Sequence, residues 1–171
     1  MIMTALMAAI TCILAPLSVS IPISPVPISL TLLVIFLSTY LLGMKMGTMS
    51  YLIYLLLGFA GLPVFSGFTG GAGKLLGPTG GYLIGFIFTA LICGFTFEHS
   101  ENRWIHCLGM ITGTAVCYLF GTVWLAHQAG LSFSAALGAG VIPFIPADMI
   151  KTAVVLLAAP ELKKRLRPVL D

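Results

Sequence analysis

The chain has 171 residues, of which 59% are hydrophobic and only 8% carry a charge. Soluble domains carry about 25% charged residues, so this composition indicates an integral membrane protein. Because each crossing needs about 20 apolar residues, the length accommodates six membrane helices in a single membrane domain, residues 1–171, and no extramembrane domain. The net charge of +3 is concentrated near the C-terminus, which argues for membrane orientation rather than for nucleic-acid binding.

The first third of the chain predicts three helices. The first is expected at residues 1–20. Three prolines within residues 21–28 then predict an extended connection. The second helix is expected at 29–42 and the third at 48–60, with a tight turn at 43–47 between them.

Residues 61–82, GLPVFSGFTGGAGKLLGPTGGY, are the one long polar interruption of the apolar sequence. Their eight glycines and two prolines predict a segment without helix. The apolar residues embedded among them argue against a disordered linker, and long loops in compact domains are usually functional. We therefore expect a folded cap over a ligand. Gly73 and Lys74 do not complete an ATP-binding Walker loop, because Leu75 stands where Ser or Thr is required.

The second half predicts a fourth helix at 80–97 and a fifth at 105–126, with a short interfacial helix at 132–137. Pro146 then begins the sixth helix, at a position that proline tolerates. This helix is expected to end near residue 159, before a basic tail.

Basic residues predict the orientation in the membrane. If six helices alternate, one side holds only Lys74. The other side holds Lys45, Arg103, Lys163, Lys164, Arg165 and Arg167. By the positive-inside rule both termini are then cytoplasmic, and the glycine-rich segment faces outward.

Asp148 and Lys151 are the acidic and basic residues within the predicted spans. Their spacing of three places them on one helix face, within reach of each other. Charges at membrane depth are expensive and usually line a cavity, so the pair indicates recognition of a polar ligand. An ion pair that only fixes helix packing is the competing interpretation. Tyr82, Ser29 and Thr31 add hydroxyl groups at the same outer level.

Small residues suggest a partner for the first helix. Ala5 and Ala9 stand four apart on one face, a spacing that lets membrane helices approach closely. The cysteines and histidines have no metal-ligand spacing, so we expect neither a metal, a cofactor nor a disulfide.

Four segments, in this order along the chain, carry a resemblance to a known family: PVPIS at 25–29, LLGFAGLPVF at 56–65, GPTGGY at 77–82 and PFIPADMIK at 143–151. Together they resemble the BioY family, the biotin-binding S components of energy-coupling factor (ECF) transporters. The resemblance covers about residues 1–167.

The resemblance implies an all-α, six-helix substrate-capture subunit in a prokaryotic cell membrane, with a biotin pocket near the external face capped by the long loop. It implies as partners a transmembrane coupling protein (T component) and two cytoplasmic ATPases. It also implies that Asp148 and Lys151 contact the biotin headgroup and that Ala5 and Ala9 contact the coupling protein. Candidate ligand contacts in the loop are Gly67, Phe68, Gly70 and Gly71.

Three alternatives remain open. The nearest is an S component for another vitamin. A membrane enzyme with Asp148 as acid or base lacks a nucleophile placed beside a base, so no catalytic residue is expected. A purely structural subunit would leave the charge pair and the long loop without a purpose.

Overall fold

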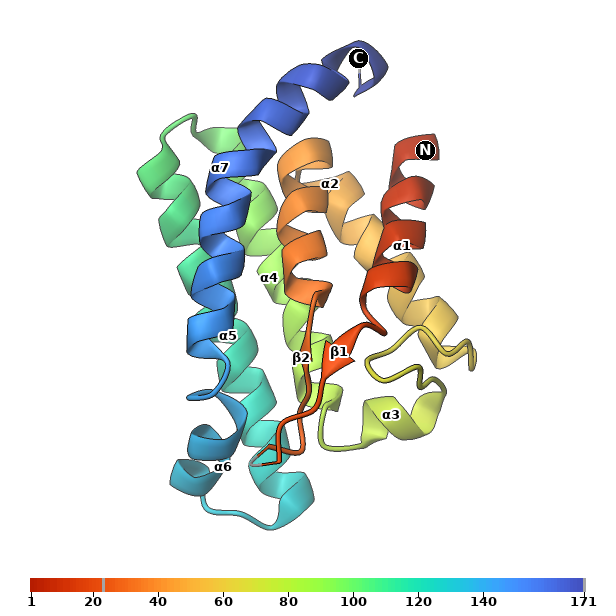
Figure 1. Ribbon diagram of the computed structural model, residues 1–171, viewed down its shortest axis with the longest axis vertical. Coiled ribbons are helices and arrows are strands. Elements are labelled where there is room, and N and C mark those ends of the chain that lie inside the picture. Colours follow the sequence, from red (N-terminus) through yellow and green to blue (C-terminus); the bar gives the residue numbers. More distant parts are fainter. Residues whose placement is uncertain (23, 171) are drawn as a thin grey trace.

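The computed structural model describes residues 1–22 and 24–170, with side chains placed as far as Leu166, so the side chain of Arg167 lies outside the described residues. The chain is mostly helical, as predicted (Figure 1). Its elements in chain order are α1 (Ile2–Leu14), β1 (Ser18–Val19), β2 (Ile28–Ser29), α2 (Thr31–Phe59), α3 (Ala72–Leu76), α4 (Gly80–His99), α5 (Arg103–Ala129), α6 (Phe133–Gly140) and α7 (Ile145–Leu170).

The first helix is shorter than predicted. α1 ends at Leu14 rather than near residue 20, because Pro16 has no N–H to continue the helical hydrogen bonds. The chain then forms an antiparallel pair of two-residue strands that the sequence did not predict, with Ser18 opposite Ser29. Ser29 therefore belongs to β2 and not to a helix.

The second and third predicted helices form the two arms of α2, which fold back on each other at Gly43. This residue has φ 78° and ψ −175°, a conformation open to glycine and costly for other residues. A Cβ atom on Gly47 would lie 2.7 Å from the Cα atom of Thr39, although eight residues of straight helix span about 12 Å. Figure 1 shows the arms running in opposite directions. The predicted turn is thus a single residue.

A side chain from α4 stabilises this reversal. The Glu98 carboxylate accepts a hydrogen bond of 2.8 Å from the backbone N–H of Met44, the first residue of the second arm. A negative charge at the start of a helix is favourable because the free N–H groups point toward it. Glu98 thereby ties the break in α2 to the end of α4.

The glycine-rich segment is a folded loop anchored to α2. Phe65 is fully buried and fills the space above Gly58, where a Cβ atom would overlap its ring. The backbone N–H of Gly71 donates to the carbonyl of Gly58 at 2.7 Å. The expectation of no helix here is wrong, because α3 forms one turn and a half at residues 72–76; its Ala, Lys and Leu residues favour helix enough to accommodate one glycine.

The last helix is longer than predicted and begins after a bend. α6 covers residues 133–140, and its axis makes an angle of 49° with that of α7. α7 continues past the expected end at residue 159 and through Pro160. In this case the missing N–H of one proline does not end the helix.

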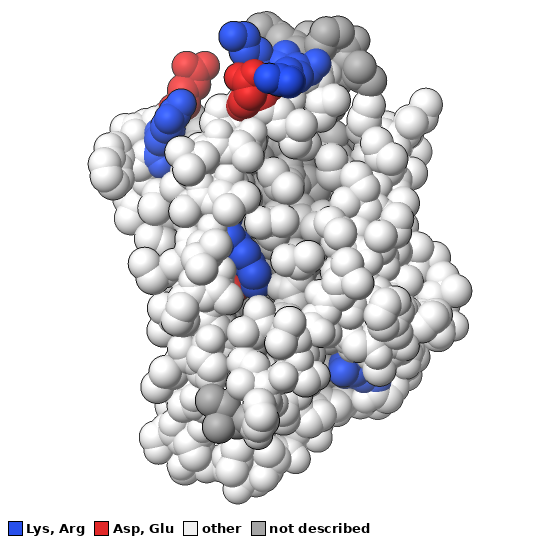
Figure 2. Space-filling model, viewed as in Figure 1, with Lys and Arg blue, Asp and Glu red and all other residues white. Residues whose placement is uncertain are grey.

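By length and apolar composition, three helices of the described residues, α2, α4 and α5, could cross a membrane, and the bent pair α6–α7 makes a fourth if it counts as one span. This count takes α2 as one helix, although its arms reverse direction at Gly43. Both ends of the described chain lie at the top of Figure 1, opposite α3, α6 and the strands. Charged side chains gather at the end with the termini, and uncharged surface covers most of the rest of this face (Figure 2).

Candidate binding site

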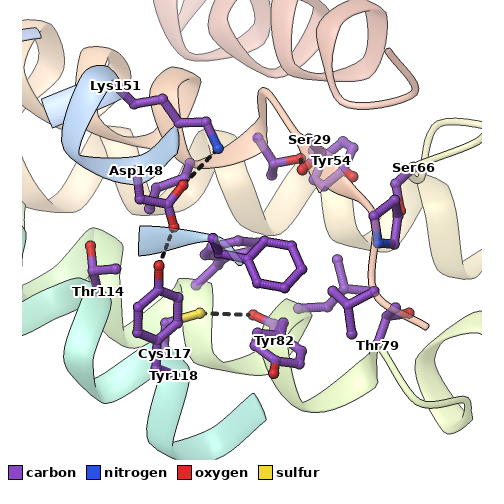
Figure 3. Close-up of a pocket in the computed structure, with 17 residues that line it drawn as sticks. Ser29, Tyr54, Ser66, Thr79, Tyr82, Thr114, Cys117, Tyr118, Asp148 and Lys151 are labelled. Atoms are coloured by element: carbon purple, nitrogen blue, oxygen red, sulfur yellow. Dashed lines mark hydrogen bonds and ion pairs between the residues drawn. The ribbon is translucent and has the colours of Figure 1, made fainter. Parts of the chain in front are cut away.

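A cavity of about 60 Å³ lies among β2, α2, α4, α5 and α7 (Figure 3). Its polar side chains form two groups. The charged end comprises Thr114, Tyr118, Asp148 and Lys151. The hydroxyl end comprises Ser29, Thr31, Tyr54, Ser66 and Thr79. Apolar side chains also line the cavity, namely Val26, Pro27, Leu32, Leu83, Phe86 and Phe144.

The charged end is built on the first turns of α7. Asp148 and Lys151 are each 8% exposed, and the Lys151 ammonium donates to Asp148 Oδ1 at 2.7 Å. The Tyr118 hydroxyl, from α5, donates to Asp148 Oδ2 at 2.6 Å. Each carboxylate oxygen therefore holds one hydrogen bond and keeps one lone pair for a further donor.

This arrangement presents opposite hydrogen-bonding functions close together. Lys151 has three N–H donors and uses one on Asp148. The charged end therefore offers a carboxylate acceptor beside an ammonium donor in a largely apolar surrounding. Because a buried charge is costly unless it is hydrogen-bonded, a ligand that completes these bonds would be bound firmly.

Ser29 and Thr31 lie at the hydroxyl end, where the Ser29 hydroxyl donates to Thr31 Oγ1 at 2.9 Å. Tyr82 also lines the cavity, but its hydroxyl donates to the carbonyl of Gly140 at 2.8 Å. Its phenol thus connects α4 to the end of α6, and only its ring surface is available to a ligand.

Four predicted loop residues, Gly67, Phe68, Gly70 and Gly71, do not line the cavity. Phe68 is 66% exposed, and Ser66 is the residue through which this part of the loop reaches the cavity. In this structure the buried ring of Phe65 fixes which neighbouring residues face inward, and the glycine spacing carries no such information. Ligand contact by the four loop residues stays a prediction.

Sequence reasoning missed Tyr54, Ser66, Thr79, Thr114 and Tyr118. Each is a polar residue of ordinary type, and composition gave no reason to prefer it over other serines, threonines and tyrosines. A signal for Thr114 and Tyr118 was available, since they stand four apart on α5 and so share a face.

The predicted partner surface lies on the outside of the bundle. Ala5 and Ala9 are exposed, whereas Thr4, Met7, Ala8 and Thr11 form the buried side of α1. A further helix could approach α1 closely at the two exposed alanines.

No group of histidine, cysteine and acidic side chains within the described residues could hold a metal ion. The four cysteines are free thiols, two buried and two partly buried. The polar groups that line the cavity are a carboxylate, an ammonium, several hydroxyl groups and the Cys117 thiol.

The fold and the site define a class: a helical membrane protein with a polar cavity among its helices. The BioY family profile matches residues 1–168. The chain belongs to the BioY family.

Curated relatives carry transporter names and not enzyme names. "Biotin transporter BioY" of Thermotoga maritima is 42% identical over 146 residues, which cover 85% of this chain and 86% of that protein. "Probable biotin transporter BioY" of Pyrococcus horikoshii is 40% identical over 161 residues, 94% of each chain. A solved structure described as the S-component for biotin from an ECF-type ABC transporter has a TM-score of 0.87 at 34% identity, and the match covers 94% of this chain and 88% of that chain.

Proposed function

We propose that this chain is the biotin-binding S component of an ECF-type ABC importer. The observation that carries the proposal is the buried Asp148–Lys151 pair facing a cavity in a chain of the BioY family. The two relatives described above are named a biotin transporter and a probable biotin transporter, and these names favour biotin as the ligand of that site.

The charged end suits the bicyclic head of biotin. This head has two ureido N–H donors and one carbonyl acceptor around an otherwise apolar body. Asp148 accepts from the N–H groups through its free lone pairs, and Lys151 donates to the carbonyl. The apolar rings of the ligand pack against Leu83, Phe86 and Phe144. Hydrogen bonds to charged groups are the strong ones, and here apolar side chains shield them from water.

Ligand entry requires outward movement of side chains around the cavity. Its volume of about 60 Å³ leaves room for a few water molecules, whereas pockets for drug-sized ligands span about 300–1,000 Å³. The loop at residues 61–79 is the segment expected to move, because it contributes Ser66 and is held mainly by Phe65 and by loop hydrogen bonds.

The chain crosses the membrane six times in this proposal: α1, the two arms of α2, α4, α5 and α7. Both termini then lie in the cytoplasm and the loop between the third and fourth crossings faces outward. The support is that the basic side chains Lys45, Arg103, Lys163 and Lys164 are exposed at the end with the termini, as the positive-inside rule requires.

The partners in this proposal are a T component and two cytoplasmic ATPases. The ATPases supply the energy, since the sequence of this chain carries no ATP-binding motif. We assign the exposed face of Ala5 and Ala9 to contact with the T component. Close helix approach at small residues is the usual means of association within a membrane.

Equilibrium binding of biotin, thiamine and riboflavin to the purified chain, without nucleotide, tests the proposal. Biotin is expected to bind and the other two vitamins are not. A folded sample that fails to bind biotin at micromolar concentration would sink the proposal. Preferential binding of thiamine or riboflavin would instead identify an S component for another vitamin.

A further inference from the structure

Tyr54 has a buried hydroxyl group that the fold itself does not use. The residue lies in the second arm of α2, is 0% exposed and lines the cavity. Its ring packs against Tyr51 and against Phe65 of the loop. Its hydroxyl has no hydrogen-bond partner within the described residues.

Other buried tyrosines make the difference clear. The hydroxyl of Tyr51 donates to the carbonyl of Leu83, and that of Tyr82 donates to the carbonyl of Gly140, each at 2.8 Å. The hydroxyl of the half-buried Tyr118 likewise donates to Asp148. Buried polar groups in proteins are nearly always paired, and within the described residues the hydroxyls of Thr48, Tyr54 and Thr122 lack a partner. Of these three residues Tyr54 alone lines the cavity, so a ligand in the cavity is in position to pair with its hydroxyl.

The surroundings of Tyr54 favour a negatively charged partner. Thr31 and Leu32, the first residues of α2, line the same cavity. The residue before them, Leu30, provides no side-chain cap, so the N–H groups of this first turn remain available. A helix N-terminus with free N–H groups favours an anion through both hydrogen bonding and its dipole. The dipole at this end comes from the first arm of α2, residues 31–42, which ends at the reversal at Gly43.

Thr31 adds a further donor. Its oxygen accepts from Ser29, which leaves its own O–H proton for another acceptor. The hydroxyl end thus combines the O–H groups of Tyr54 and Thr31 with the start of α2. Figure 3 shows Ser29 and Tyr54 apart from Asp148 and Tyr118, which stand at the charged end.

We propose that Tyr54 donates its hydroxyl proton to the carboxylate of the ligand, at the hydroxyl end of the cavity. This inference rests on the proposed function and adds an orientation: the ureido head lies at Asp148 and Lys151, and the carboxylate lies at Tyr54 and Thr31. The orientation keeps the carboxylate of the ligand away from the carboxylate of Asp148, so that like charges do not meet. It makes Tyr54 a specificity determinant for a ligand that ends in an anionic group.

Tyr54→Phe tests this inference, with biotin and biotinamide as ligands. Biotinamide replaces the carboxylate with a neutral amide. A hydrogen bond to a charged acceptor contributes more than one to a neutral acceptor, so Tyr54→Phe is expected to weaken biotin about tenfold or more and biotinamide only about threefold. The melting temperature without ligand should stay equal or rise, because the variant removes a buried unpaired hydroxyl.

Tyr51→Phe is the matched control, since it removes the neighbouring phenol oxygen but does not line the cavity. It leaves the carbonyl of Leu83 without its donor, so the melting temperature should fall while biotin affinity stays within about twofold. Biotin affinity within twofold of wild type in Tyr54→Phe would overturn the inference, and so would equal losses for biotin and biotinamide. Failure of the wild type to bind biotin would instead overturn the proposed function.

Discussion

α5 packs against α4 and against α7 in opposite ways. Between α4 and α5 the backbones approach so closely that a Cβ atom on Gly85 would lie 2.8 Å from the Cα atom of Cys117, and one on Gly113 would lie 3.1 Å from the Sγ atom of Cys93. Between α5 and α7 there is instead a largely apolar groove of about 410 Å³, and the hydrogen bond from Tyr118 to Asp148 lies at this seam.

The contrast separates the scaffold of the protein from its proposed ligand site. Small residues that let membrane helices approach give tight van der Waals packing, which fixes α4 on α5. α7 carries the charges of the cavity and is joined to α5 largely through those same polar groups. Substitutions in the α4–α5 seam that do not themselves line the cavity should therefore act mainly on stability, whereas substitutions at the polar contacts of α7 should change both stability and ligand affinity.

Lys151→Met should give the largest effect, because it leaves Asp148 as a buried charge without its counter-ion. Removing one partner of a buried ion pair costs about 3–5 kcal/mol. Thermal unfolding in detergent should show a large drop in melting temperature, and biotin binding should be lost. Asp148→Asn combined with Lys151→Met removes both charges and should recover most of the stability without recovering binding. An unchanged melting temperature in Lys151→Met would contradict the account of α7.

Tyr118→Phe removes the hydrogen bond that joins α5 to α7 and orients the Asp148 carboxylate. Hydrogen bonds to charged groups contribute about 1.5–3 kcal/mol, so both the melting temperature and the biotin affinity should fall, the affinity by about tenfold. Tyr40→Phe is the control, since Tyr40 does not line the cavity. If Tyr118→Phe lowered stability but left affinity intact, the polar seam would be structural only.

Gly85→Ala probes the tight seam. The added methyl group meets backbone atoms of α5 and cannot be relieved by a side-chain rotation, so we expect a loss of about 1–3 kcal/mol. Biotin affinity of the folded fraction should stay within about twofold. Gly138→Ala, on α6, adds the same group where no atom lies within 4 Å and should be neutral or stabilising by about 0.5–1 kcal/mol. Equal melting temperatures for the two variants would remove the distinction between the seams.

Ala5→Trp and Ala9→Trp test the surface of α1 that we assign to contact with the T component. Both alanines are exposed on α1, so the stability of the isolated chain should change by less than about 0.5 kcal/mol and biotin binding should persist. Co-purification with the T component should fail, because a bulky ring prevents close helix approach. Leu6→Trp enlarges a residue that is already large and exposed, and it should co-purify normally.

The sequence predicted those parts of the fold that depend on local chemistry. The helix pattern, the break at Gly43 and the proximity of Asp148 and Lys151 follow from apolar segments, glycine conformation and helical spacing. The strand pair at residues 18–19 and 28–29 was missed because strand pairing depends on contacts distant in sequence. α7 passes through Pro160 and continues beyond residue 159, where the sequence predicted its end.

The cavity was predicted less completely than the helices. The charge pair was identifiable because charged residues are rare at membrane depth. Tyr54 and Tyr118 were not, because a tyrosine in an apolar helix is common and only tertiary packing decides whether its hydroxyl finds a partner. Ser66, and not one of its glycine neighbours, lines the cavity because of where Phe65 is buried. The position of Phe65 is known only once the loop is folded.

Isothermal titration of biotin into Asp148→Asn tests the central claim most directly. The substitution keeps the shape of the side chain and one acceptor oxygen but removes the charge that strengthens the ureido hydrogen bonds. Because such bonds contribute about 1.5–3 kcal/mol, the account predicts an affinity about ten- to a hundredfold lower than wild type, in a sample whose folding is checked by its melting temperature in the same detergent. Affinity close to that of the wild type would contradict the assignment of Asp148 to the ligand.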